Sequence, residues 1–244
     1  FVAGCKGVKS KEKKSKNNDA TTQASQSGIK ASGSVKAHGI SVDFLTANGS
    51  ADLRDLTVFG DCKVSGSAKL SALKIKGNCS IAGSADLVNV KVGGILKTSG
   101  SCRIKDVHAS AVRCSGSVNV HDSSCETFDA SGSIKITKTR VRGATTIAGT
   151  FDVRELSAQE LTLRPNSDTA RLLLADSSAT RVTVMPGSGN SGFSIDLFGF
   201  HYSSGGSCTE ATLELDGSTV YGDIIFQKLA GKVILRNGAQ VTGK

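Results

Sequence analysis

A glycine followed by serine or threonine recurs along this chain at intervals of 16 or 17 residues. The second residue of each pair is, in order, Ser34, Ser50, Ser67, Ser84, Ser101, Ser117, Ser133 and Thr150. A repeat this short cannot bury an apolar face by itself, so each unit must stack on the next. The spacing therefore predicts a solenoid.

Apolar residues keep fixed distances from these pairs, which shows what kind of solenoid to expect. They lie five and three residues before each Ser or Thr, and one, three, six and eight residues after it; Leu53, Leu70 and Leu87 share one such position. Positions two apart face the same side of a strand, so each repeat holds three short strands. The pattern predicts an all-β, single-stranded, three-sided parallel β-solenoid, with coils about 4.8 Å apart. Right-handed coils follow from the usual handedness of parallel crossovers.

Residues between the apolar positions suggest how the coils turn and what they expose. The repeated glycines are expected to take positive φ at one corner. Each 17-residue step carries a further glycine, which predicts a second corner at Gly60, Gly77, Gly94 and Gly143. Two residues after each pair, Lys36, Asp52, Lys69 and Asp86 alternate in charge, so we expect each to lie beside its opposite on the next coil.

The chain divides into three parts. Residues 1–28 are lysine-rich with few aliphatic residues, which predicts a disordered linker. Residues 29–164 hold the regular coils. In residues 165–244 the period blurs while short strands continue, which predicts irregular closing coils with an inserted loop at 186–210. We expect that loop to cover the end of the apolar prism.

The start of the chain is relevant to location. Val2, Ala3 and Gly4 before Cys5 resemble the lipobox of bacterial lipoproteins, although small residues also precede cysteines by chance. The resemblance implies lipidation of Cys5, and Lys6 after it implies the bacterial outer membrane, with the protein periplasmic or surface-exposed. Seven of the lysines and only two acids fall in residues 1–30 of a chain with net charge +9. The sequence contains no apolar stretch of about 18 residues, so we expect no membrane-spanning helix.

The glycine-cornered coil and the closing segments GDII (222–225), GKVIL (231–235) and VTG (241–243) resemble two bacterial groups. One is the putative-adhesin, head-domain β-helix family; the other is the polymer-forming bactofilins. The first resemblance implies a non-enzymatic, lipid-anchored envelope protein that acts as a rigid structural or adhesive rod, with a protein or polysaccharide partner at the cell surface. The second implies a cytoskeletal scaffold that self-associates through its terminal coils. Neither implies catalytic residues or a cofactor.

The cysteines could bind a metal, form disulfides or lie in the core as free thiols. Five of them occupy inward positions, where cysteine acts as a small apolar residue, and no spacing fits a metal site. Cys62 and Cys79 share one position on neighbouring coils, so they are either buried free thiols or a disulfide.

An enzymatic reading has one candidate pair. Asp52 and Asp86 lie two coils apart, about 9.6 Å, near the upper limit for an inverting glycosidase. Lys69 between them and the lack of an adjacent aromatic platform make a polysaccharide-active enzyme the weaker alternative. No nucleic-acid partner is expected, because the basic segment carries no recognised module or interleaved aromatics.

Overall fold

The computed structural model describes residues 19–21, 28–165, 169–187 and 209–243. All secondary structure in these residues is β, and the strands form stacked parallel coils, a β-solenoid of about 11 turns. None of the described residues belongs to a helix that could cross a membrane. The chain forms two compact units, residues 1–111 and 112–244, and passes from one to the other within β11 (Ala85–His121).

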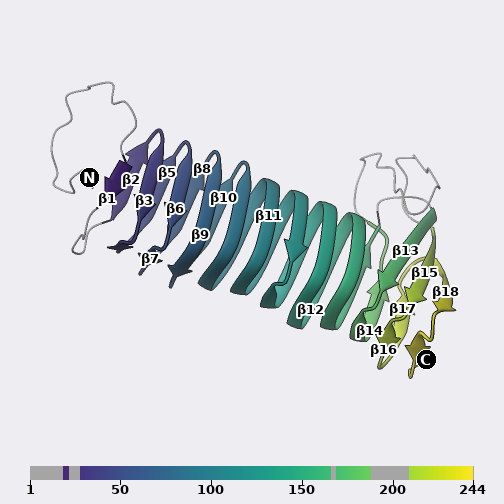
Figure 1. The fold of residues 1–244 in the computed structure, drawn as a ribbon. Coiled ribbons are helices and arrows are strands. Elements are labelled where there is room, and N and C mark those ends of the chain that lie inside the picture. Colours follow the sequence, from purple (N-terminus) through teal and green to yellow (C-terminus); the bar gives the residue numbers. More distant parts are fainter. Residues whose placement is uncertain (1–18, 22–27, 166–168, 188–208, 244) are drawn as a thin grey trace. The chain divides into compact units, whose positions relative to one another are not determined.

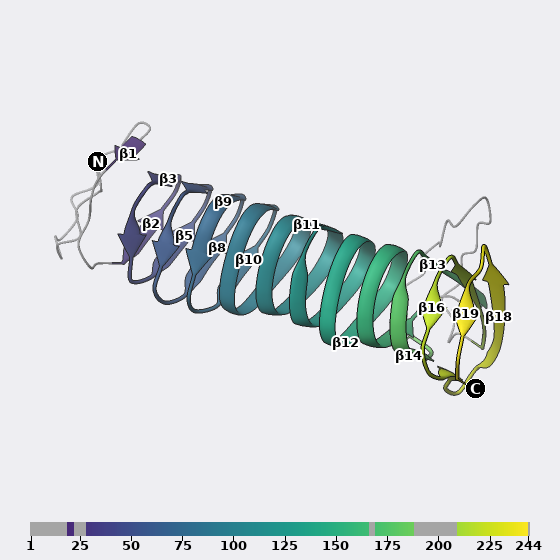
Figure 2. The ribbon, with the colours of Figure 1, turned by 60° about the horizontal axis from the view of Figure 1, so that its bottom comes forward.

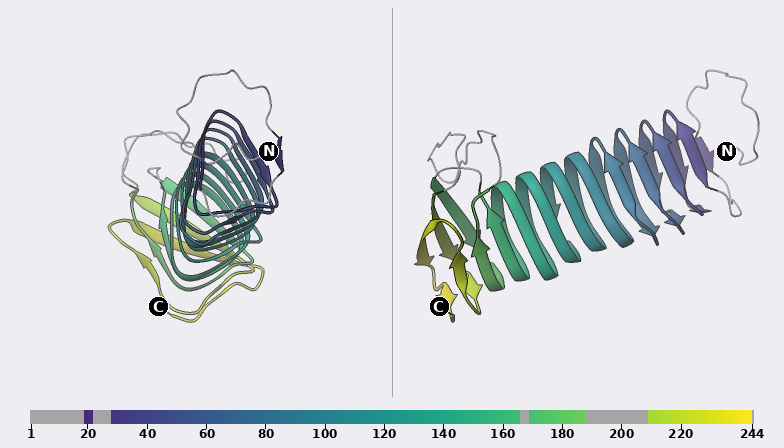
Figure 3. Two further views of the ribbon diagram at one scale, coloured as in Figure 1. Left: turned by 90° about the vertical axis from the view of Figure 1, so that its left-hand side faces the viewer. Right: turned by 180° about the vertical axis from the view of Figure 1, so that it is seen from behind.

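The first unit is built from short parallel strands that return to the same side once per coil. On one side β2, β5, β8 and β10 lie side by side (Figure 2), and each pairs with the next in strict register. Figure 1 and the end-on view of Figure 3 show these purple and blue coils one behind another. Besides β11, the strands of this unit are β1 (Asp19–Thr21), β2 (Ile29–Ser32), β3 (Val35–His38), β4 (Ser41–Val42), β5 (Leu45–Asn48), β6 (Ala51–Arg54), β7 (Thr57–Val58), β8 (Cys62–Ser65), β9 (Ala68–Ile75) and β10 (Cys79–Ala82).

The predicted inward positions form the core. Leu53, Leu70 and Leu87 are Cα partners on successive coils, and all three are fully buried. Of the six predicted inward positions in each of the eight coils, all are buried except Ile29, Ala31, Val35 and Ala109. Four polar side chains occupy inward positions of the regular coils: Thr98, Ser123, Thr139 and Thr145. The hydroxyls of Ser123 and Thr139 each donate a hydrogen bond to the carbonyl two residues before them. These bonds offset the cost of burying a polar group.

Both predicted glycine corners are present, for different reasons. The glycines before each Ser or Thr have φ between 106° and 143°. In addition, a Cβ on Gly66 would lie 2.5 Å from the carbonyl oxygen of Gly49 on the coil before. At the second corner a Cβ on Gly60 would lie 2.7 Å from the carbonyl oxygen of Asp43. That corner therefore requires glycine for close stacking.

A third corner was not anticipated from the sequence. Five residues after each Gly-Ser pair the backbone is left-handed, with φ between 48° and 67°, at Gly39, Asp55, Ala72, Asn89, Asp106, Asp122, Lys138 and Glu155. Asp, Asn and Gly adopt this conformation most easily, and together they occupy five of these eight places. That enrichment is the signal that would have located the corner.

Ala72 is a misfit at this corner, because its Cβ is strained at a φ of 54°. We expect Ala72→Gly to raise the free energy of unfolding by about 0.5–1 kcal/mol, the relief of strain exceeding the entropy cost of glycine. The same change at Ala82, an exposed strand residue without positive φ, should lower it by about 0.5–1 kcal/mol. Urea unfolding of both variants measures the two changes. If both substitutions changed the free energy of unfolding in the same direction, the assignment of this corner would be contradicted.

Within the second unit, parallel coils follow the last regular repeat. β15 pairs with β13 and then with β18 over seven residues each, so the closing coils keep strict register although their sequence period is blurred. The chain leaves the sheet after β14 and returns at Glu210, so the predicted insertion lies at the corner that Gly-Ser pairs form in earlier coils. Besides β11, the strands of this unit are β12 (Ser124–Arg164), β13 (Thr169–Ala175), β14 (Ser178–Val184), β15 (Glu210–Asp216), β16 (Thr219–Val220), β17 (Ile224–Phe226), β18 (Ala230–Arg236) and β19 (Gln240–Val241).

The expectation for residues 1–28 needs one correction. Asp19–Thr21 form β1, which pairs in parallel with β3, so this part of the expected linker is a strand. The physical reason is that β3 belongs to the first full coil and offers an open strand edge to the residues before it. The rest of the linker up to residue 27, and residues 188–208 of the inserted loop, lie outside the described residues.

Candidate functional site

The cysteines singled out from the sequence do not all lie in the described part of the chain. Cys5 lies outside the described residues. Cys62 and Cys79 are Cα partners on neighbouring coils, as predicted, and both are fully buried free cysteines. The pKa of Cys79 is raised well above its usual value by a hydrogen bond with Cys62 and by burial. Among the described residues no cluster of three or more His, Cys, Asp or Glu could hold a metal ion.

Burial also raises the pKa of the Cys125 thiol, to about 12. An unfolded cysteine ionises near 8.5. Above that pH the unfolded chain loses a proton that the folded chain keeps, so stability falls as pH rises toward 12. We expect the free energy of unfolding to fall by up to about 1.4 kcal/mol per pH unit more steeply in the wild type than in Cys125→Ala between pH 9 and 10.5. Urea unfolding at each pH measures the free energy. If it fell equally steeply with pH in the wild type and in Cys125→Ala, the thiol would be accessible to water.

Only one of the two carboxylates considered for catalysis, Asp52, forms an ion pair in the described structure. The strand register places Asp52 beside Lys36 and Lys69, and Asp86 beside Lys69, as the alternating pattern predicts. The ion pair of Asp52 is nevertheless with Arg54, two residues along the same strand, at 3.3 Å. Asp152 pairs with Arg154 in the same way at 3.1 Å. At Asp52 and Asp152, therefore, the ion pair joins two residues of the same strand and not residues of successive coils, as had been expected.

A groove of about 320 Å³ lies on the outer surface of the second unit. It crosses β12 and β14 and ends at Tyr221, which follows β16. In the regular coils its two rims are outward residues seven and nine places after the repeat position. The residues between the rims face the core, so backbone forms the floor of the groove. The lining residues are Arg140, Val141, Arg142, Ser157, Ala158, Gln159, Ser178, Ala179, Thr180 and Tyr221.

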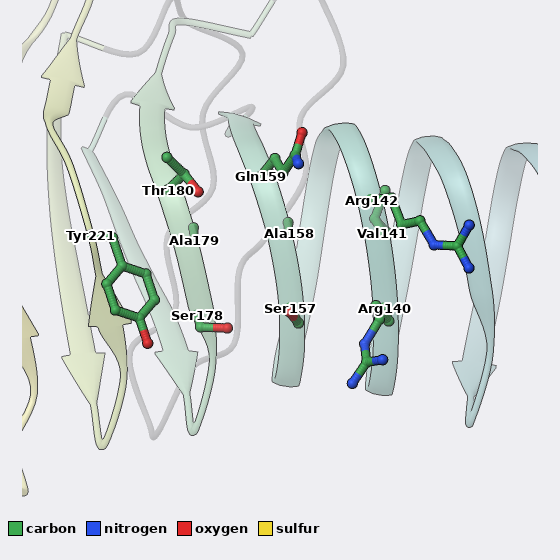
Figure 4. Close-up of a pocket in the computed structure, with 10 residues that line it drawn as sticks. All are labelled: Arg140, Val141, Arg142, Ser157, Ala158, Gln159, Ser178, Ala179, Thr180 and Tyr221. Atoms are coloured by element: carbon green, nitrogen blue, oxygen red, sulfur yellow. The ribbon is translucent and has the colours of Figure 1, made fainter.

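The groove has two chemically different ends. Figure 4 shows Arg140 and Arg142 at one end and the Tyr221 ring at the other, with the hydroxyls and amide of Ser157, Gln159, Ser178 and Thr180 between. Three coil steps separate the ends, or roughly 14 Å. Tyr221 is 64% exposed, so its ring is available to a ligand. Volume and length fit a short oligomer.

Positive charge dominates the arginine end. Arg142 donates a hydrogen bond to Glu126 at 2.8 Å, which holds its side chain in place. No carboxylate in the described part of the chain lies within ion-pair distance of Arg140, and no acidic residue is among those that line the groove. A guanidinium without an acidic partner is suited to bind a carboxylate or phosphate through two parallel hydrogen bonds.

Sequence reasoning found only part of this groove. Arg140 and Ser157 both lie seven residues after a Gly-Ser or Gly-Thr pair, so the repeat places them at the same outward position of neighbouring coils. Tyr221 was missed because it lies in a closing coil, where the period is not visible. The alternation within the closing strands, extended one coil at a time, would have placed it beside Thr180. The groove offers donors, acceptors and a ring face, which is chemistry for binding.

No family model, curated protein or solved structure matches this chain.

Proposed function

We propose that this chain is a non-enzymatic protein of a bacterial outer membrane, anchored by a lipid on Cys5, whose β-solenoid is a structural or adhesive element facing the periplasm or the cell surface. Its adhesive contact is the groove of the second unit, and the ligand is an acidic saccharide. The single observation that carries the ligand class is Arg140 without an acidic partner, in a groove lined by hydroxyls and ended by an exposed tyrosine.

Each part of an acidic sugar chain has a counterpart in this groove. Arg140 supplies a charged donor pair for a carboxylate. Ser157, Gln159, Ser178 and Thr180 recur at each coil step and can hydrogen-bond successive ring hydroxyls. Tyr221 offers an apolar ring face with a polar tip. A neutral polymer would leave the guanidinium with water alone as its partner, and so would bind less tightly.

The test is calorimetric titration of the purified chain with short uronic-acid oligomers and with neutral glucan oligomers of equal length. We expect the acidic oligomers to bind at least about tenfold more tightly, and increasing salt to weaken them. Oligomer length should stay unchanged after long incubation. Equal binding of both oligomers, or no binding, contradicts the ligand class, and shortened oligomers contradict the non-enzymatic proposal. Incorporation of labelled palmitate, lost in Cys5→Ala, tests the anchor separately.

A second candidate, a polymer-forming scaffold, is favoured by the last coil. Val233 and Leu235 are partners of Leu213 and Leu215, which are fully buried. On the last coil the same positions are 37% and 50% exposed, since no described coil follows. Apolar ends of this kind support end-to-end self-association. Filaments of the purified protein in electron micrographs, lost in Val233→Lys/Leu235→Lys, would favour this candidate; a monomeric sedimentation profile at high concentration would exclude it.

A further inference from the structure

The charges of the first unit are divided unequally among its sides. Between residues 28 and 100, the side that carries β3 and β6 holds three basic and three acidic residues: Lys36, Arg54, Lys69, Asp52, Asp55 and Asp86. The other two sides and the corner between them hold six lysines and two aspartates: Lys30, Lys63, Lys74, Lys76, Lys91, Lys97, Asp43 and Asp61. All six lysines are exposed. The net charge is therefore zero on the first side and +4 on the others.

One of the two aspartates in the basic region is engaged by the backbone. The Asp61 carboxylate accepts a hydrogen bond from the backbone N–H of Asn78 at 2.9 Å, and Asn78 accepts one from the N–H of Ile95 on the next coil. These side chains hold the second corner together. Two lysines, in contrast, stack directly, because Lys74 and Lys91 are Cα partners on neighbouring coils. Like charges in that position destabilise a sheet, so an external anion would relieve a repulsion that the fold retains.

Two aromatic side chains lie at the same corner. Phe44 and Phe59 are 36% and 48% exposed, although apolar side chains of this size usually lie inside. The Lys30 Nζ lies 5.3 Å from the centre of the Phe44 ring, and the Lys76 Nζ lies 4.5 Å from that of Phe59. Each ring is thus paired with a cation, an attractive arrangement that keeps positive charge beside the apolar surface.

We propose that this basic ridge, made of Lys30, Phe44, Phe59, Lys63, Lys74, Lys76, Lys91 and Lys97, docks on an anionic lipid surface. Lysines attract anionic headgroups, while aromatic rings enter the boundary between headgroups and acyl chains. A soluble polyanion would satisfy the lysines and leave the rings exposed to water, so a membrane accounts for both features.

The inference relies on the proposed function only for a location at a membrane, and its test is independent of the anchor and the groove. The full chain carrying Cys5→Ser is mixed with vesicles of phosphatidylcholine, with or without one third phosphatidylglycerol, and bound protein is measured by sedimentation. We expect binding to the anionic vesicles only. Lys74→Gln/Lys91→Gln should weaken it at least about tenfold, and so should Phe44→Ser/Phe59→Ser.

The matched control lies on the balanced side. Lys36→Gln/Lys69→Gln removes the same charge, yet should change binding less than about threefold, because those lysines face away from the ridge. The chain has no tryptophan, so Phe59→Trp and Val88→Trp introduce single probes on the two sides. The first should shift its emission to shorter wavelength on vesicles, and the second should not.

Three results would overturn the proposal. One is equal weakening by both lysine pairs, which would mean that net charge alone controls binding. Another is an unshifted Phe59→Trp emission on bound vesicles. The third is a lysine variant that loses binding to vesicles while the phenylalanine variant binds like the unchanged chain, together with an affinity for heparin equal to that for anionic vesicles. That pattern would mean that the ridge binds soluble polyanions.

Discussion

Gly66→Ala is expected to lower the free energy of unfolding by about 3 kcal/mol or more. Two penalties add at this corner. A φ of 123° is strained for any residue with a Cβ, at a cost of about 1–3 kcal/mol. The added Cβ would also lie 2.5 Å from the Gly49 carbonyl oxygen, so the coils would have to separate. Urea unfolding measures the loss.

Gly33→Ala is the matched control for this prediction. Gly33 has a similar φ of 111°, but no atom lies within 4 Å of its added Cβ. The control should therefore show the backbone strain without the clash between coils, and lose clearly less stability than Gly66→Ala. Equal losses would mean that close stacking does not contribute at the Gly-Ser corner.

Arg140→Gln is expected to weaken binding of an acidic oligosaccharide by about 10- to 100-fold, the range for a hydrogen bond to a charged group. Tyr221→Ala should weaken it several-fold through loss of the ring face. Arg181→Gln is the control, because that arginine pairs with Glu160 at 3.9 Å and does not line the groove. Calorimetry with the same oligomers measures all three variants. Unchanged affinity in Arg140→Gln would remove the basis for an acidic ligand.

Much of the fold is predictable from the sequence because each coil repeats the same physical solution. Leu53, Leu70 and Leu87 mark an inward position by recurrence alone, and the glycines mark the corners by their lack of a side chain. The left-handed corner at Ala72 and Lys138 escaped prediction because it is defined by φ, and tertiary packing holds unfavoured residues there. The closing coils were expected, but their register was not predicted, because their steps vary in length and the register comes from stacking on the previous coil.

The candidate sites were harder to predict, since outward residues are not constrained by a core. The repeat identified the position shared by Arg140 and Ser157, but the groove also depends on Tyr221 from a coil without a visible period. In the basic ridge, Lys74 and Lys91 both lie seven residues after a Gly-Ser pair, so the repeat alone places them on neighbouring coils. Phe44 and Phe59 lie at a corner where coil length changes, and they were therefore not assigned to a common surface.

All these surfaces depend on residues one coil apart lying side by side. The most direct measurement is oxidative cross-linking of Lys74→Cys/Lys91→Cys, whose Cα atoms are partners at a spacing of about 4.8 Å, within disulfide range. We expect this pair to form a disulfide rapidly, and Lys74→Cys/Val88→Cys, on different sides of the coil, to stay reduced. Rapid cross-linking of the second pair, or none in the first, would contradict the stacked register.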